Sequence, residues 1–204
     1  MKIRQASQGD AKTLGSLIFS SAPNALAVTF NIDEELSALN FLQRSLLSAD
    51  GQYGYENHWV AEIDNQVVGC LSLWHSDLPD SFHQATLIGL TDFYGIEQTL
   101  SLVQASQILQ DCIPKPKRHE FCVGHFAVLK QYQRLGVGNV LLTFAHEQAL
   151  ILGKSALSLD VDSANLDAIE FYQGQGFIQE SASDISPRMQ SLGVGRHLHM
   201  SKAL

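Results

Sequence analysis

The sequence predicts an α+β domain, in which a sheet of about seven strands is flanked by helices. Short apolar segments of strand length alternate with longer amphipathic segments of helical period along the chain. One stretch, 120–152, runs from an apolar strand through a polar turn into a helix. The length of 204 residues suits a single domain, 1–204, with room for an insertion.

The N-terminal residues predict a strand followed by a helix. Lys2–Ala6 has the composition of a short strand. A helix with one apolar face is expected over 11–20, and Ser7 or Asp10 is available as its N-cap. Pro23 ends this helix.

Asp33 predicts the start of a second helix, as its N-cap. Glu34 and Glu35 then fall in the first turn, where acidic side chains favour the helix dipole. Four leucines supply the apolar side of this helix: Leu36, Leu39, Leu46 and Leu47.

Two strands follow as a hairpin. The segments 58–63 and 66–74 are apolar and rich in strand-forming residues, and Asp64 and Asn65 between them suit a tight turn. Trp74 ends the second strand, where packing is the favoured role for its ring.

About 40 residues, 77–117, separate this hairpin from the next strand. A helix is expected over 96–109, because apolar residues recur there on one stripe that reaches Gln107. Prolines at 114 and 116 end it. Three side chains of this segment are possible substrate contacts, although solvated or structural roles are favoured: His83, Asp92 and Tyr94.

The fourth strand, with its apolar run over 121–129, has a useful alternation of side chains. Unless a bulge intervenes, one face carries Glu120, Cys122, Gly124, Phe126 and Val128. The opposite face then carries His119, Phe121, Val123, His125 and Ala127. A histidine has a pKa suited to proton transfer, but this alternation turns His125 away from Glu120.

A polar turn after this strand leads to two glycines, Gly136 and Gly138, at the start of a helix that reaches Leu152. Glycine lets another group approach the backbone, and the first N–H groups of a helix attract anions. The turn therefore suits a phosphate, with Arg134 as a nearby cation, although tight turning alone is an equal alternative. Position 141 is leucine, which excludes a dinucleotide fingerprint, and no Gly-Lys-Ser/Thr follows, which excludes a P-loop.

The remaining chain continues the mixed pattern. A strand is expected over 156–161, a helix over 165–175, a sixth strand from Phe177 and a last strand over 195–202, with a polar loop at 181–190 between the last two.

Two motifs resemble a known family. Gln133-Arg134-Leu135-Gly136-Val137-Gly138 resembles the Gln/Arg-x-x-Gly-x-Gly/Ala signature of the GCN5-related N-acetyltransferases (GNAT). A second motif of that family is similar to a segment with Asn165, Ala168, Ile169, Phe171, Tyr172, Gly176 and Phe177. The resemblance is strong over 120–180 and faint before it.

The resemblance implies a GNAT fold, with a central mixed, mostly antiparallel sheet that splays between the fourth and fifth strands. The segment 77–117 departs from the family pattern and is therefore interpreted as a helical insertion. The region 21–31 corresponds to the part of the family fold that lines the acceptor site.

The resemblance also implies acetyl-CoA as cosubstrate. Its pantetheine arm would bind the backbone of Phe126, Ala127 and Val128, where an N–H also polarises the thioester carbonyl. The pyrophosphate would bind at the motif residues Gln133, Arg134, Leu135, Gly136, Val137 and Gly138. Asn165 matches a cofactor contact, and its alternative role is a helix cap.

Two residues are predicted to be catalytic. Tyr172 matches the family tyrosine that protonates the departing thiolate, and a core tyrosine is its alternative role. Family members often carry a general base on the fourth strand at the positions of Cys122 or Gly124, and neither is an obvious base here. Glu120 lies on that face and is the candidate, whereas Cys122 remains a minor candidate nucleophile.

Composition limits the remaining choices. A net charge of −8 and a pI of about 5.4 argue against a nucleic-acid partner. No apolar run approaches the roughly 20 residues of a membrane span, and the first ten residues do not resemble a secretion signal. The three cysteines, Cys70, Cys112 and Cys122, show no paired spacing, which suits a reducing cytoplasm. No spacing of metal ligands stands out, so no metal is expected.

The predicted function is transfer of an acetyl group from acetyl-CoA directly to a primary amine. A small-molecule acceptor is favoured over a protein amine, because the insertion would tend to close the acceptor side. The alternatives are a non-catalytic acyl-CoA-binding or regulatory module of the same fold, a protein-amine acetyltransferase, and an enzyme for longer acyl groups. The expected assembly is a monomer or a homodimer.

Overall fold

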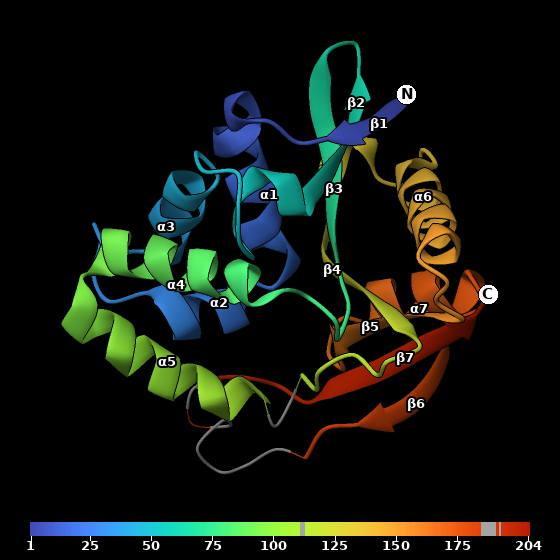
Figure 1. The fold of residues 1–204 in the computed structure, drawn as a ribbon. Helices are drawn as coiled ribbons and strands as arrows, with labels where there is room; N and C mark the ends of the chain where they lie inside the picture. The colour runs from blue at the N-terminus through green and yellow to red at the C-terminus, as the bar shows by residue number, and fades with distance from the viewer. Residues whose placement is uncertain (111–112, 185–190, 192) are drawn as a thin grey trace.

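The computed structural model describes residues 1–110, 113–184, 191 and 193–204. Its centre is one seven-stranded sheet with the strand order β1-β2-β3-β4-β5-β7-β6 (Figure 1). Neighbouring strands are antiparallel, except that β4 and β5 are parallel. The predicted mixed, mostly antiparallel sheet is therefore confirmed. The strands are β1 (Lys2–Gln5), β2 (His58–Ile63), β3 (Gln66–Trp74), β4 (Glu120–Val128), β5 (Ala156–Asp162), β6 (Ile178–Ala182) and β7 (His197–Ala203).

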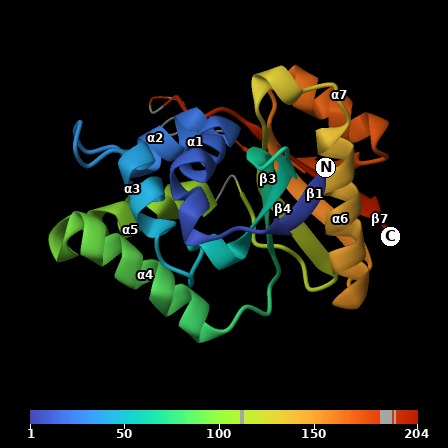
Figure 2. The same ribbon diagram turned by 90° about the horizontal axis from the view of Figure 1, so that it is seen from above.

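Helices cover both faces of the sheet. Two groups of helices lie on opposite sides, as the view from above shows most clearly (Figure 2). The first group is α1 (Ala11–Ser21), α2 (Pro23–Phe30), α3 (Ala38–Ser45), α4 (Asp80–Tyr94) and α5 (Ile96–Gln110). The second group is α6 (Val137–Ile151) and α7 (Leu166–Gly174). Three short 3-10 turns complete the described elements: η1 (Gln8–Asp10), η2 (Tyr55–Asn57) and η3 (Lys130–Tyr132).

Each face of the sheet has its own core. The α1-side core joins Leu14 of α1 and Phe41 of α3 to Val60 and Cys70 of the sheet. The α6-side core joins Leu141 of α6 to strand residues such as Leu71, Leu157 and Met200. Adjacent strand positions therefore belong to different cores, and membership of a core identifies the face on which a side chain lies.

The β2–β3 hairpin is confirmed with the predicted bounds. Asp64 and Asn65 connect the two strands with φ angles of 50° and 61°. Positive φ at both central residues is the geometry of the two-residue turn that matches strand twist, and Asp and Asn tolerate it better than most residues.

The predicted start of the second helix was wrong. Asp33 does not cap a helix: its Oδ1 accepts hydrogen bonds from the N–H groups of Glu35 and Leu36 and closes a local turn. Helix α3 begins four residues after Glu34, at Ala38, where the Ser37 hydroxyl accepts from the N–H of Asn40. Aspartate favours both turns and caps, so local sequence did not decide between them.

The predicted insertion 77–117 contains two helices rather than one. The expected helix over 96–109 corresponds to α5, and α4 precedes it. Tyr94, at the end of α4, is 4% exposed and donates a hydrogen bond from its hydroxyl to the carbonyl of Phe30, over 2.7 Å. The insertion is thus attached to the end of α2. Cys112, part of the predicted loop 181–190 and the side chain of Gln107 lie outside what the structure describes.

Candidate functional site

Strands β4 and β5 separate soon after they begin. They pair only over Glu120–Cys122 and Ala156–Ser158. Beyond this point β4 continues to Val128 and β5 to Asp162, and the described residues of these two strands no longer pair. The splayed sheet is therefore confirmed, and it leaves the main chain of 123–128 unpaired with β5.

A bulge interrupts β4 where the gap opens. On β3, Cys70 pairs with Ala127 and Ser72 pairs with Gly124, so one residue of β3 faces two residues of β4. His125, one of those two, has a φ of 45°. A bulge of this kind reverses the alternation of side chains along the strand.

Because of the bulge, side chains in the second half of β4 lie on other faces of the sheet than the simple alternation predicts. Phe126 packs on the α6 side, with its ring centroid 6.0 Å from that of Phe171 and 5.9 Å from that of Tyr172. Ala127 belongs to the α1-side core. His125 faces His58 of β2, which shares its face with Val60 of the α1-side core. The prediction that His125 points away from the face of Glu120 was therefore wrong.

The turn after β4 leads into α6 as predicted. Gly136 is the N-cap of α6 with a φ of 84°, and a β-carbon added to it would meet no atom within 4 Å. A β-carbon at Gly138 would lie 3.0 Å from Cζ of Phe171. The side-chain amide of Gln133 donates to the carbonyl of Val128 over 3.1 Å and holds the turn against the strand. The open space at Gly136, beside the first N–H groups of α6, fits an anionic group.

Tyr172 lies on α7 beside the bulged half of β4. Its ring is 7% exposed and packs on Phe126, Phe171 and Phe177. Its hydroxyl has no hydrogen-bond partner among the described residues. Burial raises the pKa of Tyr172, and the Cys122 thiol raises it further. The hydroxyl is therefore a proton donor near neutral pH, close to the end of the β4–β5 pairing.

Asn165 caps α7. Its Oδ1 accepts a hydrogen bond from the N–H of Ala168 over 3.2 Å. The capping role that the sequence left open is thus present, and the cofactor contact of Asn165 stays a prediction.

Glu120 lies in a buried cluster of charged groups. The carboxylate is 1% exposed, and its Oε2 accepts from the N–H of Lys117 over 2.7 Å. Its Oε1 lies 3.2 Å from Nζ of Lys117 and 3.4 Å from Nε2 of His199, whose Nδ1 is 3.0 Å from Asp160. Burial acts to raise the pKa of Glu120, but the hydrogen bonds from Lys117 and His199 outweigh it and lower the pKa. Both oxygens are engaged, so this geometry favours a structural role, and a catalytic role of Glu120 stays a prediction.

A second polar pair lies at the bulge. Nδ1 of His125 is 3.3 Å from Nε2 of His58, and Nδ1 of His58 is 2.9 Å from the carbonyl oxygen of Gly54. The rings of Tyr53 and Trp74 pack on His125, with centroids 5.7 and 5.3 Å away. Burial lowers the pKa of His58 to about 4 and that of His125 to about 3, so both rings are neutral at pH 7.

Cys122 is buried next to the gap. Burial raises the pKa of its thiol to about 12. Since the thiolate is the nucleophilic form, this environment disfavours an acyl-enzyme on Cys122.

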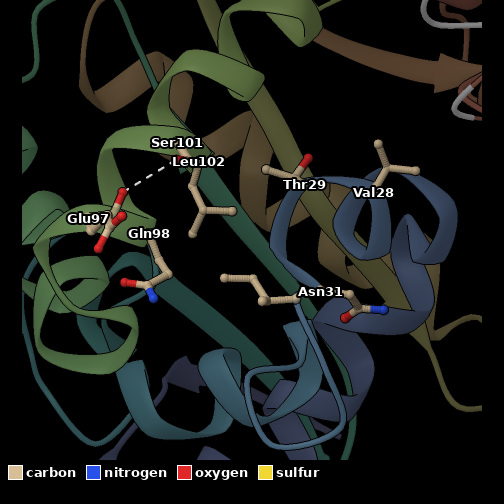
Figure 3. A pocket seen from close by; sticks show the side chains of 8 residues that line it. Val28, Thr29, Asn31, Glu97, Gln98, Ser101 and Leu102 are labelled. Carbon is tan, nitrogen blue, oxygen red and sulfur yellow. Dashed lines mark hydrogen bonds between the residues drawn. The ribbon is translucent and has the colours of Figure 1, made fainter.

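The other predicted contacts lie apart from this gap. His83 and Asp92 are exposed on α4. A cavity of about 440 Å³ lies between α2 and α5, and its lining includes Thr29, Asn31, Gln98 and Leu102 (Figure 3). Its lining includes no residue of the predicted cofactor or catalytic set.

Sequence reasoning missed three residues of the site: His58, Asp160 and His199. A partial signal was present, because alternate positions on a strand share a face and His197 and His199 both alternate with apolar neighbours. Their partners, however, come from strands that are distant in the sequence.

Within the described ranges, no group of three or more His, Cys, Asp or Glu side chains is arranged to hold a metal ion. No single helix in the described part of the chain is long and apolar enough to cross a membrane. One bent pair of helices has the length and composition of a membrane span only when its two members are taken together. The pair is Gln8–Ser21 and Pro23–Phe30, with an angle of 105° between them.

Comparison with known proteins shows which family and which solved structures the chain is similar to. The model of the acetyltransferase (GNAT) family matches residues 29–177. An N-acetyltransferase from Staphylococcus aureus Mu50 is 19% identical, with a TM-score of 0.73 over 99% of this chain and 100% of that chain. A ribosomal-protein-alanine N-acetyltransferase from Brucella melitensis is 20% identical, with a TM-score of 0.57 and complete coverage of both chains.

A third solved structure is similar over a part of its length. The N-acetylglutamate synthase from Neisseria gonorrhoeae, complexed with coenzyme A and N-acetyl-glutamate, is 18% identical, with a TM-score of 0.56. The similarity covers 100% of this chain and 35% of that chain. No curated protein sequence matches the chain.

Proposed function

We propose, on the premise that the chain belongs to the acetyltransferase (GNAT) family, that it moves an acetyl group from acetyl-CoA directly to a primary amine. The observation that carries the proposal is the gap that opens beyond Cys122 and Ser158, with unpaired β4 main chain on one side and Tyr172 beside it. A thioester bound in this gap would lie near the N–H groups of β4 and the protonated hydroxyl of Tyr172.

The proposed cosubstrate site extends from the gap to the start of α6. The pantetheine arm binds the main chain of Phe126, Ala127 and Val128. The pyrophosphate binds the turn formed by Gln133, Arg134, Leu135, Gly136, Val137 and Gly138. The open space at Gly136 and the unpaired N–H groups at the helix start support this placement.

The chemistry needs a neutral amine and a protonated leaving group. The amine lone pair forms the C–N bond, and the electrons of the C–S bond leave with sulfur. Tyr172 gives its proton to the thiolate, and the low acidity of its buried hydroxyl keeps that proton available. The β4 N–H groups stabilise the carbonyl oxygen as charge develops on it.

A small-molecule amine is the proposed acceptor, in a monomer or homodimer that binds neither nucleic acid nor membrane. The support is that α4 and α5 add a second tier of helices on the acceptor side, attached through Tyr94 and Phe30. A protein amine is the alternative, and the acceptor panel below includes peptides for that reason.

The test is release of thiol from acetyl-CoA in the presence of pooled amines and pooled peptides, by wild type and Tyr172→Phe. We expect wild-type release with a small-molecule pool and a fall in kcat of about 100-fold or more in the variant. Tyr55→Phe is the control, because Tyr55 packs on the α1-side core, whereas Tyr172 packs on the α6-side core. Saturable acetyl-CoA binding without release by any pool would instead support a non-catalytic acyl-CoA-binding module.

A further inference from the structure

The bulge in β4 places a histidine in a conformation that costs free energy. His125 has a φ of 45°, in the left-handed region where residues other than glycine are strained. Such strain concentrates at functional sites. His125 immediately precedes Phe126, the first residue of the proposed pantetheine site. Its side chain lies on the opposite face from the ring of Phe126, which is the face of α1–α5.

The hydrogen bonds of this histidine fix the position of its proton. The Gly54 carbonyl can only accept, so Nδ1 of His58 carries a hydrogen and donates to it over 2.9 Å. In a neutral ring Nε2 of His58 is then an acceptor. Nδ1 of His125, 3.3 Å away, therefore carries the hydrogen of the second bond. Nε2 of His125 is left as a bare lone pair.

This lone pair is free to meet a ligand. Nε2 of His125 has no hydrogen-bond partner among the described residues, and the ring is half-buried. Ser72, on the same face, pairs in register with both His58 and Gly124. Its Oγ is fully buried and unpaired, 3.0 Å from the position of a β-carbon at Gly124. A buried hydroxyl without a partner and a bare lone pair on the same face of the sheet indicate a polar guest that is present during function.

We propose that His125 receives the acceptor amine, by accepting a hydrogen bond from the attacking N–H at Nε2, and that His58 is the positioning residue that fixes the tautomer of His125. This inference rests on the proposed function. As the C–N bond forms and sulfur leaves with the C–S electrons, one N–H proton is shared with Nε2 and released to solvent. Sulfur takes the proton of Tyr172, which solvent replaces.

The surroundings of His125 define the chemical class of acceptor. The titratable groups that pack on it are His58, Tyr53 and Cys70, and all are neutral at pH 7, because burial lowers the pKa of the imidazole and raises the pKa values of the phenol and the thiol. The hydrogen bond and ring contacts of the His125 side chain with described residues involve no carboxylate, which disfavours an ammonium group at its lone pair. The preferred acceptors are therefore amines of low pKa, such as hydrazines and aromatic amines, over alkylamines with a pKa of about 10.

The first test is independent of turnover. Long-range proton–nitrogen NMR of the uniformly 15N-labelled full chain reports which nitrogen of each imidazole carries hydrogen, with His58→Gln and His125→Asn used for assignment. We expect His58 and His125 both as Nδ1–H tautomers at pH 7. A His125 ring protonated at Nε2 would overturn the proposal.

The second test separates the two histidines by kinetics. Asparagine tolerates positive φ better than most residues, so His125→Asn keeps the bulge and removes Nε2. We expect kcat/KM for the amine to fall about 100-fold or more, while KM for acetyl-CoA is unchanged. His58→Met removes the acceptor for His125 and should cost about tenfold, whereas His58→Gln restores an acceptor of similar reach and should recover most of the loss.

The outcomes distinguish this inference from the proposed function. His119→Asn, at an exposed histidine just before β4, is the control and should match wild type. Wild-type turnover that falls in Tyr172→Phe but not in His125→Asn would overturn the role of His125 and leave the proposed function intact. Equal losses in His58→Gln and His58→Met would overturn the positioning role of His58. A wild type without turnover on any amine would overturn the proposed function itself.

Discussion

Nε2 of His199 on β7 lies 3.4 Å from Oε1 of Glu120 on β4, so a hydrogen bond reaches across β5 and joins the two halves of the splayed sheet. We expect Glu120→Gln to lower the free energy of unfolding by about 1–3 kcal/mol, because a hydrogen-bonded carboxylate is lost from a buried site. Chemical denaturation measures this change. A general base would behave differently: kcat would fall about 100-fold or more with stability unchanged, and that result would support the catalytic role predicted for Glu120.

The same cluster predicts a dependence of stability on pH. The hydrogen bond to Asp160 raises the pKa of His199 above its ordinary value of 6.5, against the effect of burial, and Glu120 adds to the rise. A raised pKa in the folded state contributes stability that is complete below pH 6.5 and is lost as the pH rises through the folded value. We therefore expect the unfolding free energy of the wild type to fall as the pH rises above 6.5. In His199→Gln this fall should be absent.

Thermal or urea unfolding between pH 5.5 and 9 checks this prediction. The groups that face His199 are Asp160 and Glu120, with Lys117 on the far side of Glu120. His119→Asn is the control, because an exposed histidine without these partners should leave the profile unchanged. Parallel profiles for wild type and His199→Gln would contradict the raised pKa.

The parts of the fold that local chemistry determines could be predicted from the sequence. The β2–β3 hairpin depends on Asp64 and Asn65, which tolerate positive φ, and the α6 turn depends on Gly136, whose φ of 84° suits glycine. In both places the backbone conformation depends on one or two residues, which can be identified in the sequence.

The parts that depend on distant contacts could not be predicted. The positive φ of the bulge falls at His125 and not at the neighbouring Gly124, and the bulge is defined by the register of β4 against β3. The Glu120–His199 contact joins residues 79 apart in the chain. Alternation along one strand carries no information about either feature, and for this reason the face of His125 was predicted wrongly.

The attachment of the insertion gives a third prediction. The hydroxyl of Tyr94 is buried and donates to the Phe30 carbonyl over 2.7 Å, and its pKa is raised by burial, so it remains protonated. Tyr94→Phe should lower the free energy of unfolding by about 1 kcal/mol. Tyr132→Phe is the matched control, since its hydroxyl bond to Gln66 is exposed and 3.3 Å long. Equal stability changes in the two variants would contradict an anchoring role for Tyr94.

The two ends of α6 offer a matched pair for the cosubstrate site. Gly136 and Gly153 have φ angles of 84° and 65°, and a β-carbon at either would meet no atom within 4 Å. Gly136→Ala and Gly153→Ala should therefore lose similar stability, about 1–2 kcal/mol each, from strain alone.

Only one of these variants should weaken acetyl-CoA binding. At Gly136 the added methyl group enters the space beside the first N–H groups of α6, where the pyrophosphate is proposed to bind, whereas Gly153 lies at the far end of the helix. We expect Kd for acetyl-CoA, measured by titration calorimetry, to rise about tenfold in Gly136→Ala and to stay at the wild-type value in Gly153→Ala. An equal rise in both would attribute the effect to strain in α6, and no rise in either would place the pyrophosphate elsewhere.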